Sequence, residues 1–409
     1  MKPSGIEWIG DIPDDWEIYR LKNEVVFVNG YAFDGSELHQ DKEVPVIRIG
    51  DISSGVIDYS STLKTNVKSG LSEYELRKND ILIAMSGATT GKTAIVKTNE
   101  KAYINQRVGI IRATKCNIFI KYLLETKGFF NYIFLVAGGS AQPNISMHNI
   151  LNFQIPKIRL DTQQKIADYL DEKCGEIDAT IAKQKESIEK LKAYKQSLIS
   201  ETVTKGLDKS APLKPSGIDY LGDIPSHWEI KKLKFLVSLI DNKTKDGHSI
   251  SLENIESGTG KLIETENTYD GEGISFKEND LLFGKLRPYL AKVYLSALKG
   301  RALGDFYVMR ANKGTNPNFL KFVLLSDWFI KIVDSSTYGT KMPRASWDFT
   351  GGMRIPLPPI SEQDCISSYL ETKCSEVDTF IIEKQNIIQK LDAYKKSLIF
   401  ECVTGKRLV

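Results

Sequence analysis

The feature that most constrains this fold is an internal repeat. Residues 2–18 read KPSGIEWIGDIPDDWEI and residues 214–230 read KPSGIDYLGDIPSHWEI, with 12 of 17 positions identical. Residues 163–204 and 363–404 match at 21 of 42 positions and follow in the same order. Because two such matches in one order do not arise by chance, the chain is a tandem duplication, and we expect two similar structural units.

The composition is that of an ordinary soluble globular protein, with 41% hydrophobic and 26% charged residues. The 409 residues exceed the usual ~150-residue domain, so more than one core is expected. Lys+Arg 55 against Asp+Glu 52 gives a net charge of only +3. Bulk charge therefore does not hold this chain on nucleic acid, and any such contact must come from a local patch.

The sequence predicts neither a membrane segment nor a metal site. No apolar run reaches the ~18 residues that span a bilayer, and no apolar segment follows the first residues as in a secretory signal. The five cysteines never form a CxxC pair, and the four histidines are scattered without metal-ligand spacing. We expect reduced thiols, no membrane contact and a cytoplasmic location.

Two stretches between the matched segments have diverged in length and content: residues 19–162 and residues 231–362. Short apolar runs such as Ile81–Met85 and Leu281–Phe283, bounded by Gly, Asn and Asp, predict strands. Phe119–Leu135 and Asn318–Val333 have the spacing and length of a helix each. We therefore expect two compact α+β domains that recognise different things.

Residues 162–203 and 362–403 predict two long helices, because they contain no proline and their apolar residues recur at intervals of three and four. Asp161 and Ser361 are the expected N-caps. The seam consists of Leu170, Ile177, Ile181, Ile188 and Leu191 with polar Gln184, and of Leu370, Val377, Ile381, Ile388 and Leu391 with polar Lys384. A seam this narrow needs a partner, which favours an antiparallel coiled coil with Gln184 and Lys384 meeting near its centre. The alternative is that each helix packs on its own domain.

Several motifs, taken in order, carry a resemblance to a known family. They are the two openings, Gly87-Ala88-Thr89-Thr90-Gly91-Lys92, Asn105-Gln106, Gly284-Lys285-Leu286-Arg287-Pro288-Tyr289-Leu290, Gly304-Asp305-Phe306, and Ile155-Pro156 and Ile355-Pro356 before the repeated helices. In this combination the chain resembles the specificity (S, or HsdS) subunit of Type I restriction–modification systems. The resemblance covers essentially the whole chain.

The resemblance implies an α+β fold with two target-recognition domains, joined by two long helices that form an antiparallel coiled coil with an internal pseudo-twofold repeat. The expected boundaries are 1–158 and 206–358 for the domains and 159–205 and 359–409 for the helices. Each domain would read one half of a split, asymmetric site in double-stranded DNA, and the helices would set the spacer. The implied partners are two methyltransferase subunits and the restriction/motor subunits. No catalytic residue and no cofactor are expected in this chain.

The candidate DNA-binding residues lie in loops at matching places of the two inserts. In the first insert they are Ser86, Thr89, Thr90, Lys92, Gln106, Gln142 and Asn144; in the second they are Lys285, Arg287, Tyr289, Lys341 and Arg344. Arginine pairs bidentately with guanine, and asparagine or glutamine pairs with adenine, which motivates these choices. The alternative is that these segments are plain hairpin turns or solvated basic turns.

Two features are not expected to be functional sites. Residues 86–93 resemble a P-loop, but only three residues separate Gly87 from Gly91 and the stretch lies between two predicted strands, whereas a P-loop opens a helix. Trp16 and Trp228, in the repeated openings, are expected to be packing residues rather than bases' stacking partners. A coiled-coil adaptor between two proteins and a nucleotide-hydrolysing enzyme remain the rival classes.

Overall fold

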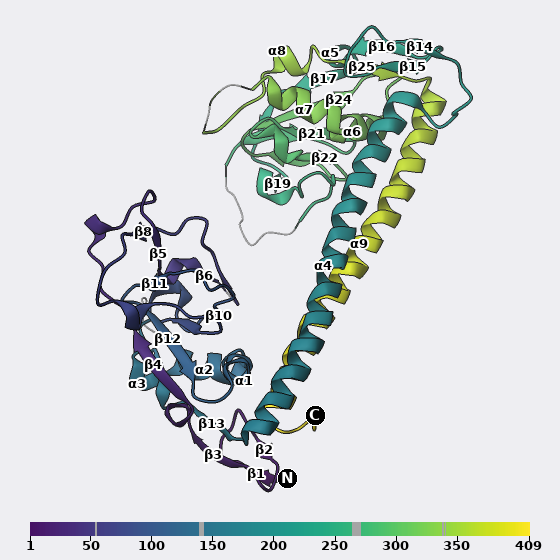
Figure 1. Cartoon of the computed structure of the whole chain (residues 1–409). Helices are drawn as coiled ribbons and strands as arrows, with labels where there is room; N and C mark the ends of the chain where they lie inside the picture. The colour runs from purple at the N-terminus through teal and green to yellow at the C-terminus, as the bar shows by residue number, and fades with distance from the viewer. Residues whose placement is uncertain (54, 139–142, 264–270, 338, 340) are drawn as a thin grey trace. The chain divides into compact units, whose positions relative to one another are not determined.

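The computed structural model describes residues 1–53, 55–138, 143–263, 271–337, 339 and 341–409. The chain divides into two compact units, one made of Met1–Lys183 and Ile387–Val409 and the other of Gln184–Asn386. The β-rich part of the first unit is called domain 1, and that of the second unit is called domain 2. Each unit also contains a part of each long helix (Figure 1). Within the described residues, no helix is both long enough and apolar enough to cross a bilayer.

Domain 1 is built on a four-stranded antiparallel sheet with the strand order β10-β9-β12-β4. Strand β9 is buried at every position, because neighbouring elements cover both of its faces. The strands are β1 (Lys2–Pro3), β2 (Asp11–Ile12), β3 (Glu17–Arg20), β4 (Val25–Asn29), β5 (Val44–Ile47), β6 (Ile52–Ser53), β7 (Val56–Ile57), β8 (Lys64–Thr65), β9 (Ile81–Ala84), β10 (Thr93–Ile95), β11 (Tyr103–Ile104), β12 (Val108–Ala113) and β13 (Gln154–Lys157). The helices are α1 (Asn117–Leu124), α2 (Lys127–Val136) and α3 (Met147–Leu151).

Domain 2 repeats this plan with the sheet order β17-β24-β21-β22. A second sheet has the order β18-β20-β23-β19. The strands are β14 (Leu213–Pro215), β15 (Asp223–Pro225), β16 (Glu229–Lys232), β17 (Val237–Ile240), β18 (Lys243–Thr244), β19 (His248–Ile250), β20 (Gly273–Phe276), β21 (Asp280–Gly284), β22 (Val293–Leu295), β23 (Gly300–Ala302), β24 (Phe306–Ala311) and β25 (Arg354–Leu357). The helices are α5 (Leu233–Leu236), α6 (Pro317–Leu325), α7 (Asp327–Ser335) and α8 (Trp347–Thr350).

The two helical stretches predicted inside the domains are each broken in two. The prediction of a single helix is wrong at Thr126, where extended backbone separates α1 from α2 and the side-chain oxygen accepts a hydrogen bond from Phe129 N–H at 3.3 Å. Ser326 takes the same place between α6 and α7, with φ −65° and ψ 144°. Hydroxyl residues favour such caps because they bond to nearby backbone groups in place of the continuing helix.

The long helices α4 (Leu160–Lys205) and α9 (Ile360–Val403) pack together as an antiparallel pair (Figure 1). In the first unit, Asp178 accepts from Lys395 at 2.7 Å. In the second unit, Lys195 donates to Asp378 at 2.7 Å and Lys384 donates to Gln184 at 3.2 Å. Within the second unit, the residue numbers of the partners on α9 decrease as those on α4 increase, so the two helices are antiparallel. The predicted helix pair is therefore confirmed, and the alternative of two separate helices is excluded.

All the seam residues named from the sequence lie on the buried side of these helices, either buried or half-buried. Fully buried positions include Leu170 and Leu370, each 0% exposed. The expected N-caps are wrong by two residues, because the carbonyl oxygens of Arg159 and Pro359 accept the first main-chain bonds of the helices. Asp161 and Ser361 lie in the first turn instead.

Each repeated opening packs against the end of a long helix. In the first unit, Lys406, just past α9, donates from Nζ to the carbonyl oxygens of Ile9 and Asp11. In the second unit, Trp228 is 1% exposed and donates from Nε1 to Glu362 at 2.9 Å. Trp16 is likewise buried at 8% exposure, as expected for a packing residue. The repeated sequence thus builds the junction between each domain and the helices.

Candidate nucleic-acid interface

Two loops of domain 1 are held together by main-chain hydrogen bonds. The first loop, residues 85–92, connects β9 to β10, and the second, residues 143–146, precedes α3. Gly87 N–H donates to the carbonyl of Pro143 at 3.0 Å, and Ile145 N–H donates to the carbonyl of Met85 at 2.9 Å. We call these segments the paired loops of domain 1. These two bonds between the loops involve peptide groups alone.

Domain 2 has the same arrangement in residues 285–292 and 341–346, and its main-chain bonds lie 200 positions after those of domain 1. We call these segments the paired loops of domain 2. Arg287 N–H donates to the carbonyl of Pro343 at 2.8 Å, and Ala345 N–H donates to the carbonyl of Lys285 at 2.9 Å. All the candidates predicted from the sequence except Gln106 and Gln142 lie in these four loops, and main-chain bonds hold each pair of loops together.

The first loop of each pair needs left-handed backbone at two positions. In domain 1 these positions are glycines, Gly87 at φ +77° and Gly91 at φ +81°. In domain 2 they are Arg287 at φ +52° and Ala291 at φ +47°. A residue with a Cβ pays for this conformation, typically about 1 kcal/mol or more, so the fold alone would favour glycine at position 287. Arg287 and Ala291 therefore both occupy positions whose backbone conformation glycine would adopt more easily.

The threonines of the first loop are engaged within domain 1. Thr89 Oγ1 donates to the carbonyl of Ile49 at 3.0 Å. Thr90 Oγ1 donates to the carbonyls of Gly87 at 2.7 Å and Pro143 at 3.1 Å. These hydroxyls therefore stabilise the paired loops from inside.

The other candidates of domain 1 are placed separately. Ser86 is half-buried and pairs through its backbone with Asn144, whose side chain is exposed. Gln106 is also exposed, in a turn fastened to the first loop where Met85 N–H donates to the carbonyl of Arg107 at 2.9 Å. Lys92 instead lines a cavity with residues of α1 and α4. Gln142 lies outside the described residues.

In domain 2, Asp305 connects two of the candidates. Its Oδ2 atom lies 2.9 Å from Arg344 Nη2, and its Oδ1 atom lies 3.9 Å from Lys285 Nζ. Its carbonyl accepts from Lys285 N–H at 2.8 Å, as that of Arg107 does from Met85 in domain 1. Asp305 thus orients a guanidinium that is itself 53% exposed.

Arg287, Tyr289 and Lys341 are exposed and, among the described residues, have no ion-pair or side-chain hydrogen-bond partner. Their donors are therefore available to a ligand. Sequence reasoning did not select Arg107 and Asp305 as site residues, although Arg107 directly follows the motif Asn105-Gln106 and Asp305 is part of the motif Gly304-Asp305-Phe306. The signal was present, but only the main-chain bonds show that the two residues occupy one place with opposite charge.

The glycine-rich stretch 86–93 is a short turn between antiparallel strands β9 and β10, so it does not open a helix as a P-loop does. Over the described parts of the chain, no group of three or more His, Cys, Asp or Glu side chains is arranged to hold a metal ion. What the paired loops present is a set of amide and guanidinium donors suited to base edges and phosphates.

Comparison with known proteins agrees with this geometry. Residues 13–192 match the family model described as the Type I restriction modification DNA specificity domain. The MjaVIII specificity subunit of Methanocaldococcus jannaschii is 23% identical over 97% of this chain and 93% of its own length. The EcoBI specificity subunit of Escherichia coli is 26% identical over 97% of this chain and 87% of its own length.

Two solved structures share the fold. A chain from a study of complex assembly in the type I restriction–modification system superposes with a TM-score of 0.73, at 14% identity, over 97% of this chain and 100% of that one. The HsdS subunit of Thermoanaerobacter tengcongensis superposes with a TM-score of 0.53, at 15% identity, over 97% of this chain and 98% of that one. At these identities the likeness is one of fold.

Two β-rich domains with paired loops and a duplicated pair of long helices define an α+β fold that is shared with a solved HsdS subunit. The chain belongs to the family of type I restriction–modification specificity (HsdS) subunits. It is the DNA specificity subunit of such a system, and as such it is non-catalytic.

Proposed function

We propose that each pair of loops reads one half of a split, asymmetric DNA site. The observation that carries this proposal is the recurrence of the same main-chain bonds at positions 87/143 and 287/343, while the side chains on them differ. A constant scaffold with variable side chains suits two readers of unlike sequences. Residues 1–158 and 206–358 are then the target-recognition domains, and 159–205 and 359–409 are the helical segments.

The proposed base readers are the candidate residues in and beside each pair of loops. In domain 2, Arg287 and Arg344 suit guanine, with Lys285, Tyr289 and Lys341 on phosphate or backbone. In domain 1, Gln106, Gln142 and Asn144 suit adenine, with Ser86 and Lys92 as secondary contacts. We assign Thr89 and Thr90 to support of the loop, since their hydroxyls already bond to carbonyl oxygens.

The partners follow from the family. The chain would bind double-stranded DNA in the cytoplasm and dock two methyltransferase subunits and the restriction/motor subunits. The helix pair would set the spacer between the half-sites, as two readers on one face of B-DNA sit about 34 Å apart per turn. A cofactor would belong to the methyltransferase subunits.

The test uses the chain assembled with its methyltransferase subunits. The methylated motif is read from the host genome by single-molecule sequencing, and methylation rates are measured on duplexes with single base changes in either half. We expect Arg344→Ala to reduce discrimination about tenfold at one half-site, within the 1–3 kcal/mol typical of a bidentate base contact.

Asn144→Ala is the matched control, because it changes the equivalent position of domain 1. It should act on the other half-site. An equal loss on every sequence would make Arg344 a phosphate contact. No loss from either variant would remove the paired loops as the interface. Absence of any gel shift with DNA by the complex would favour the adaptor class instead.

A further inference from the structure

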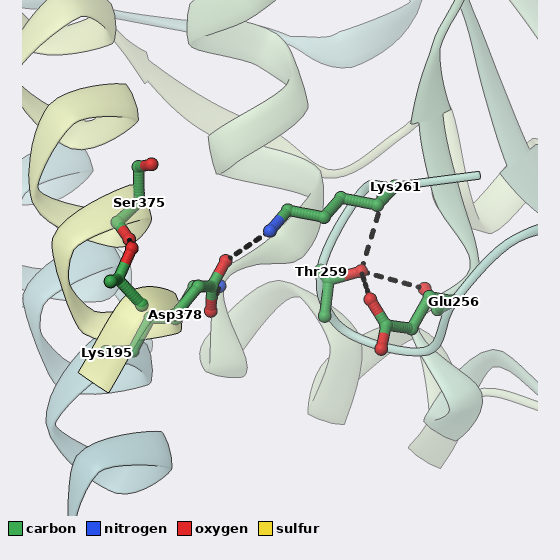
Figure 2. A network of polar contacts seen from close by, with 7 residues as sticks. Lys195, Glu256, Thr259, Lys261, Ser375 and Asp378 are labelled. Carbon is green, nitrogen blue, oxygen red and sulfur yellow. Dashed lines mark hydrogen bonds and ion pairs between the residues drawn. The ribbon is translucent and has the colours of Figure 1, made fainter. Parts of the chain in front are cut away.

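A turn of domain 2 links a long helix to a recognition loop. The turn spans residues 255–261, and its ends pair where Glu256 N–H donates to the carbonyl of Lys261 at 2.9 Å. Thr259 Oγ1 closes it from inside by donating to Glu256 Oε2 at 2.8 Å (Figure 2). These two bonds fix the conformation of the turn, so its two sides keep their positions relative to each other.

On one side the turn is bonded to the helices. Lys261 Nζ donates to Asp378 Oδ2 at 2.8 Å, and Lys195 of α4 donates to Asp378 Oδ1 at 2.7 Å (Figure 2). The Asp378 side chain is 16% exposed and that of Lys195 is 9% exposed. Burial works against the ionised carboxylate, but the two lysines outweigh it and keep the pKa of Asp378 below its usual value.

On the other side the same turn supports the first recognition loop. Gly258 N–H donates to the carbonyl of Ala291 at 3.1 Å, and Lys292 Nζ donates to the carbonyl of Ile255 at 2.5 Å. Ala291 is the left-handed residue with which that loop ends. A continuous set of bonds therefore runs from Asp378 through Lys261 and the turn to residues 285–292.

The described residues of domain 1 do not form this link. Its equivalent turn is closed by the pair Ser53 and Val56, which corresponds to Glu256 and Lys261, so valine stands where domain 2 has lysine. Asp178, the repeat equivalent of Asp378, bonds to Lys395 at 2.7 Å. Within the described part of domain 1, no side chain completes a second ion pair with Asp178, which is 58% exposed.

We propose that Asp378 is a positioning residue for DNA recognition by domain 2: through Lys261 it fixes the turn 255–261, and with it the recognition loop 285–292, on the helix pair. This inference rests on the proposed function of the paired loops. The two domains then differ, since the loop of domain 2 is connected to α9 through an ion pair, for which the described part of domain 1 has no counterpart.

Lys261→Met is the variant that isolates this role. The lysine is 55% exposed, Asp378 keeps its bond to Lys195 when Lys261 is lost, and methionine keeps most of the length of the side chain. Asp378→Asn is less clean, because it also leaves the buried Lys195 without its carboxylate. An exposed ion pair contributes little to global stability, so the thermal midpoint should stay unchanged while the loop loosens.

The experiment uses the full chain assembled with its methyltransferase subunits. In Lys261→Met we expect amide hydrogen exchange in residues 255–261 and 285–292 to become about two- to fivefold faster, as loss of a weak ion pair allows. Discrimination at the half-site that Arg344→Ala affects should fall by a similar factor. The other half-site should be read as before, and Lys261→Arg should restore both measurements.

Asp178→Asn is the matched control, because it removes the same helix-to-helix ion pair in the repeat without a domain lysine. It should leave half-site discrimination unchanged. The proposal is overturned if Asp178→Asn and Lys261→Met act alike, or if Lys261→Met is silent while Arg344→Ala loses discrimination. If Arg344→Ala is silent too, the proposed interface fails and this inference falls with it.

Discussion

Lys384 donates from Nζ to Oε1 of Gln184 at 3.2 Å, and these two residues occupy the same position of the two sequence repeats. In two antiparallel copies of one helix, equivalent positions face each other at one level only. The ion pairs of Asp178 with Lys395 and of Lys195 with Asp378 are likewise exchanged by the repeat. The contact therefore marks the centre of the helix pair and fixes its register.

The polar centre should cost stability. Replacing both residues, as Gln184→Leu with Lys384→Leu, should raise stability by about 1–2 kcal/mol, because a desolvated polar contact gives way to apolar packing. The measurement is the thermal unfolding midpoint. Gln184→Leu alone serves as the control, and it should gain less, since it leaves the Lys384 ammonium facing a leucine. A lower midpoint in the double variant would contradict this account.

The length of the helices should set the spacer. Inserting or deleting one heptad in both helices should change the gap tolerated between half-sites and leave the half-sites themselves unchanged, because a heptad keeps the seam in register. Methylation of a series of duplexes with different spacers measures this. An unchanged spacer preference would remove the helices from that role.

Breaking the buried ion pair beside the sheet should destabilise domain 1 strongly. Asp80 is 2% exposed and binds Arg112 through two bonds of 2.9 Å, so Asp80→Ala should cost about 3–5 kcal/mol in urea unfolding. Asp280→Ala is the repeat equivalent and should cost less, because its partner Arg310 is 37% exposed against 16% for Arg112. The reverse ranking would show that solvation of the arginine does not matter here.

Arg287→Gly should separate stability from recognition. Glycine relieves the left-handed backbone at φ +52°, so the free energy of unfolding should hold or rise by up to about 1 kcal/mol. Discrimination at one half-site should fall in the same protein. Ala291→Gly relieves similar strain without removing a charge and should leave discrimination intact. Loss of stability in Arg287→Gly would show that its side chain is needed by the fold.

The thiols should differ sharply in reactivity. Cys365 is exposed, whereas Cys116, Cys174, Cys374 and Cys402 are buried. Burial raises the pKa of Cys402 to about 11, so at pH 8 only about one molecule in a thousand carries its thiolate. Iodoacetamide at pH 8 should therefore alkylate Cys365 alone in the folded chain, as peptide mass spectrometry would show.

The pH dependence has a definite sign. Because the folded-state pKa of Cys402 lies above its unfolded value, its contribution to stability is present below about pH 9 and declines as the pH rises toward 11. The thermal midpoint should fall over that interval, and Cys402→Ser should lessen the fall.

For the alkylation experiment, rapid modification of the four buried cysteines at pH 8 would indicate that the helix ends open.

The pair of duplicated long helices was predictable because the sequence repeats and the apolar periodicity both indicate it. The seam of Leu170 and Leu370 and the polar pair at its centre follow from spacing alone. The breaks at Thr126 and Ser326 were not, since apolar spacing continues across them and only the local backbone shows the interruption. The helix starts were misplaced by two residues, because the sequence does not show that the carbonyl oxygens of Arg159 and Pro359 accept the first main-chain bonds of the long helices.

The candidate site was predictable as a location but not as chemistry. Matching positions directed attention to Arg287 and Arg344, yet the sequence held no sign that Thr90 turns inward or that Asp305 holds Arg344. Both depend on which carbonyl or carboxylate comes within 3 Å or so after the chain has folded. Lys261 was missed because its partner, Asp378, is far away in the sequence.

The main-chain bonds between positions 87 and 143 and between 287 and 343 have a consequence for how such subunits change over generations. Every residue except proline offers a peptide N–H, so a mutation in these loops can change the side chains that they carry and still keep the main-chain bonds. Under the proposed function, new target preferences can therefore arise by point mutation in one domain at a time while the fold is kept.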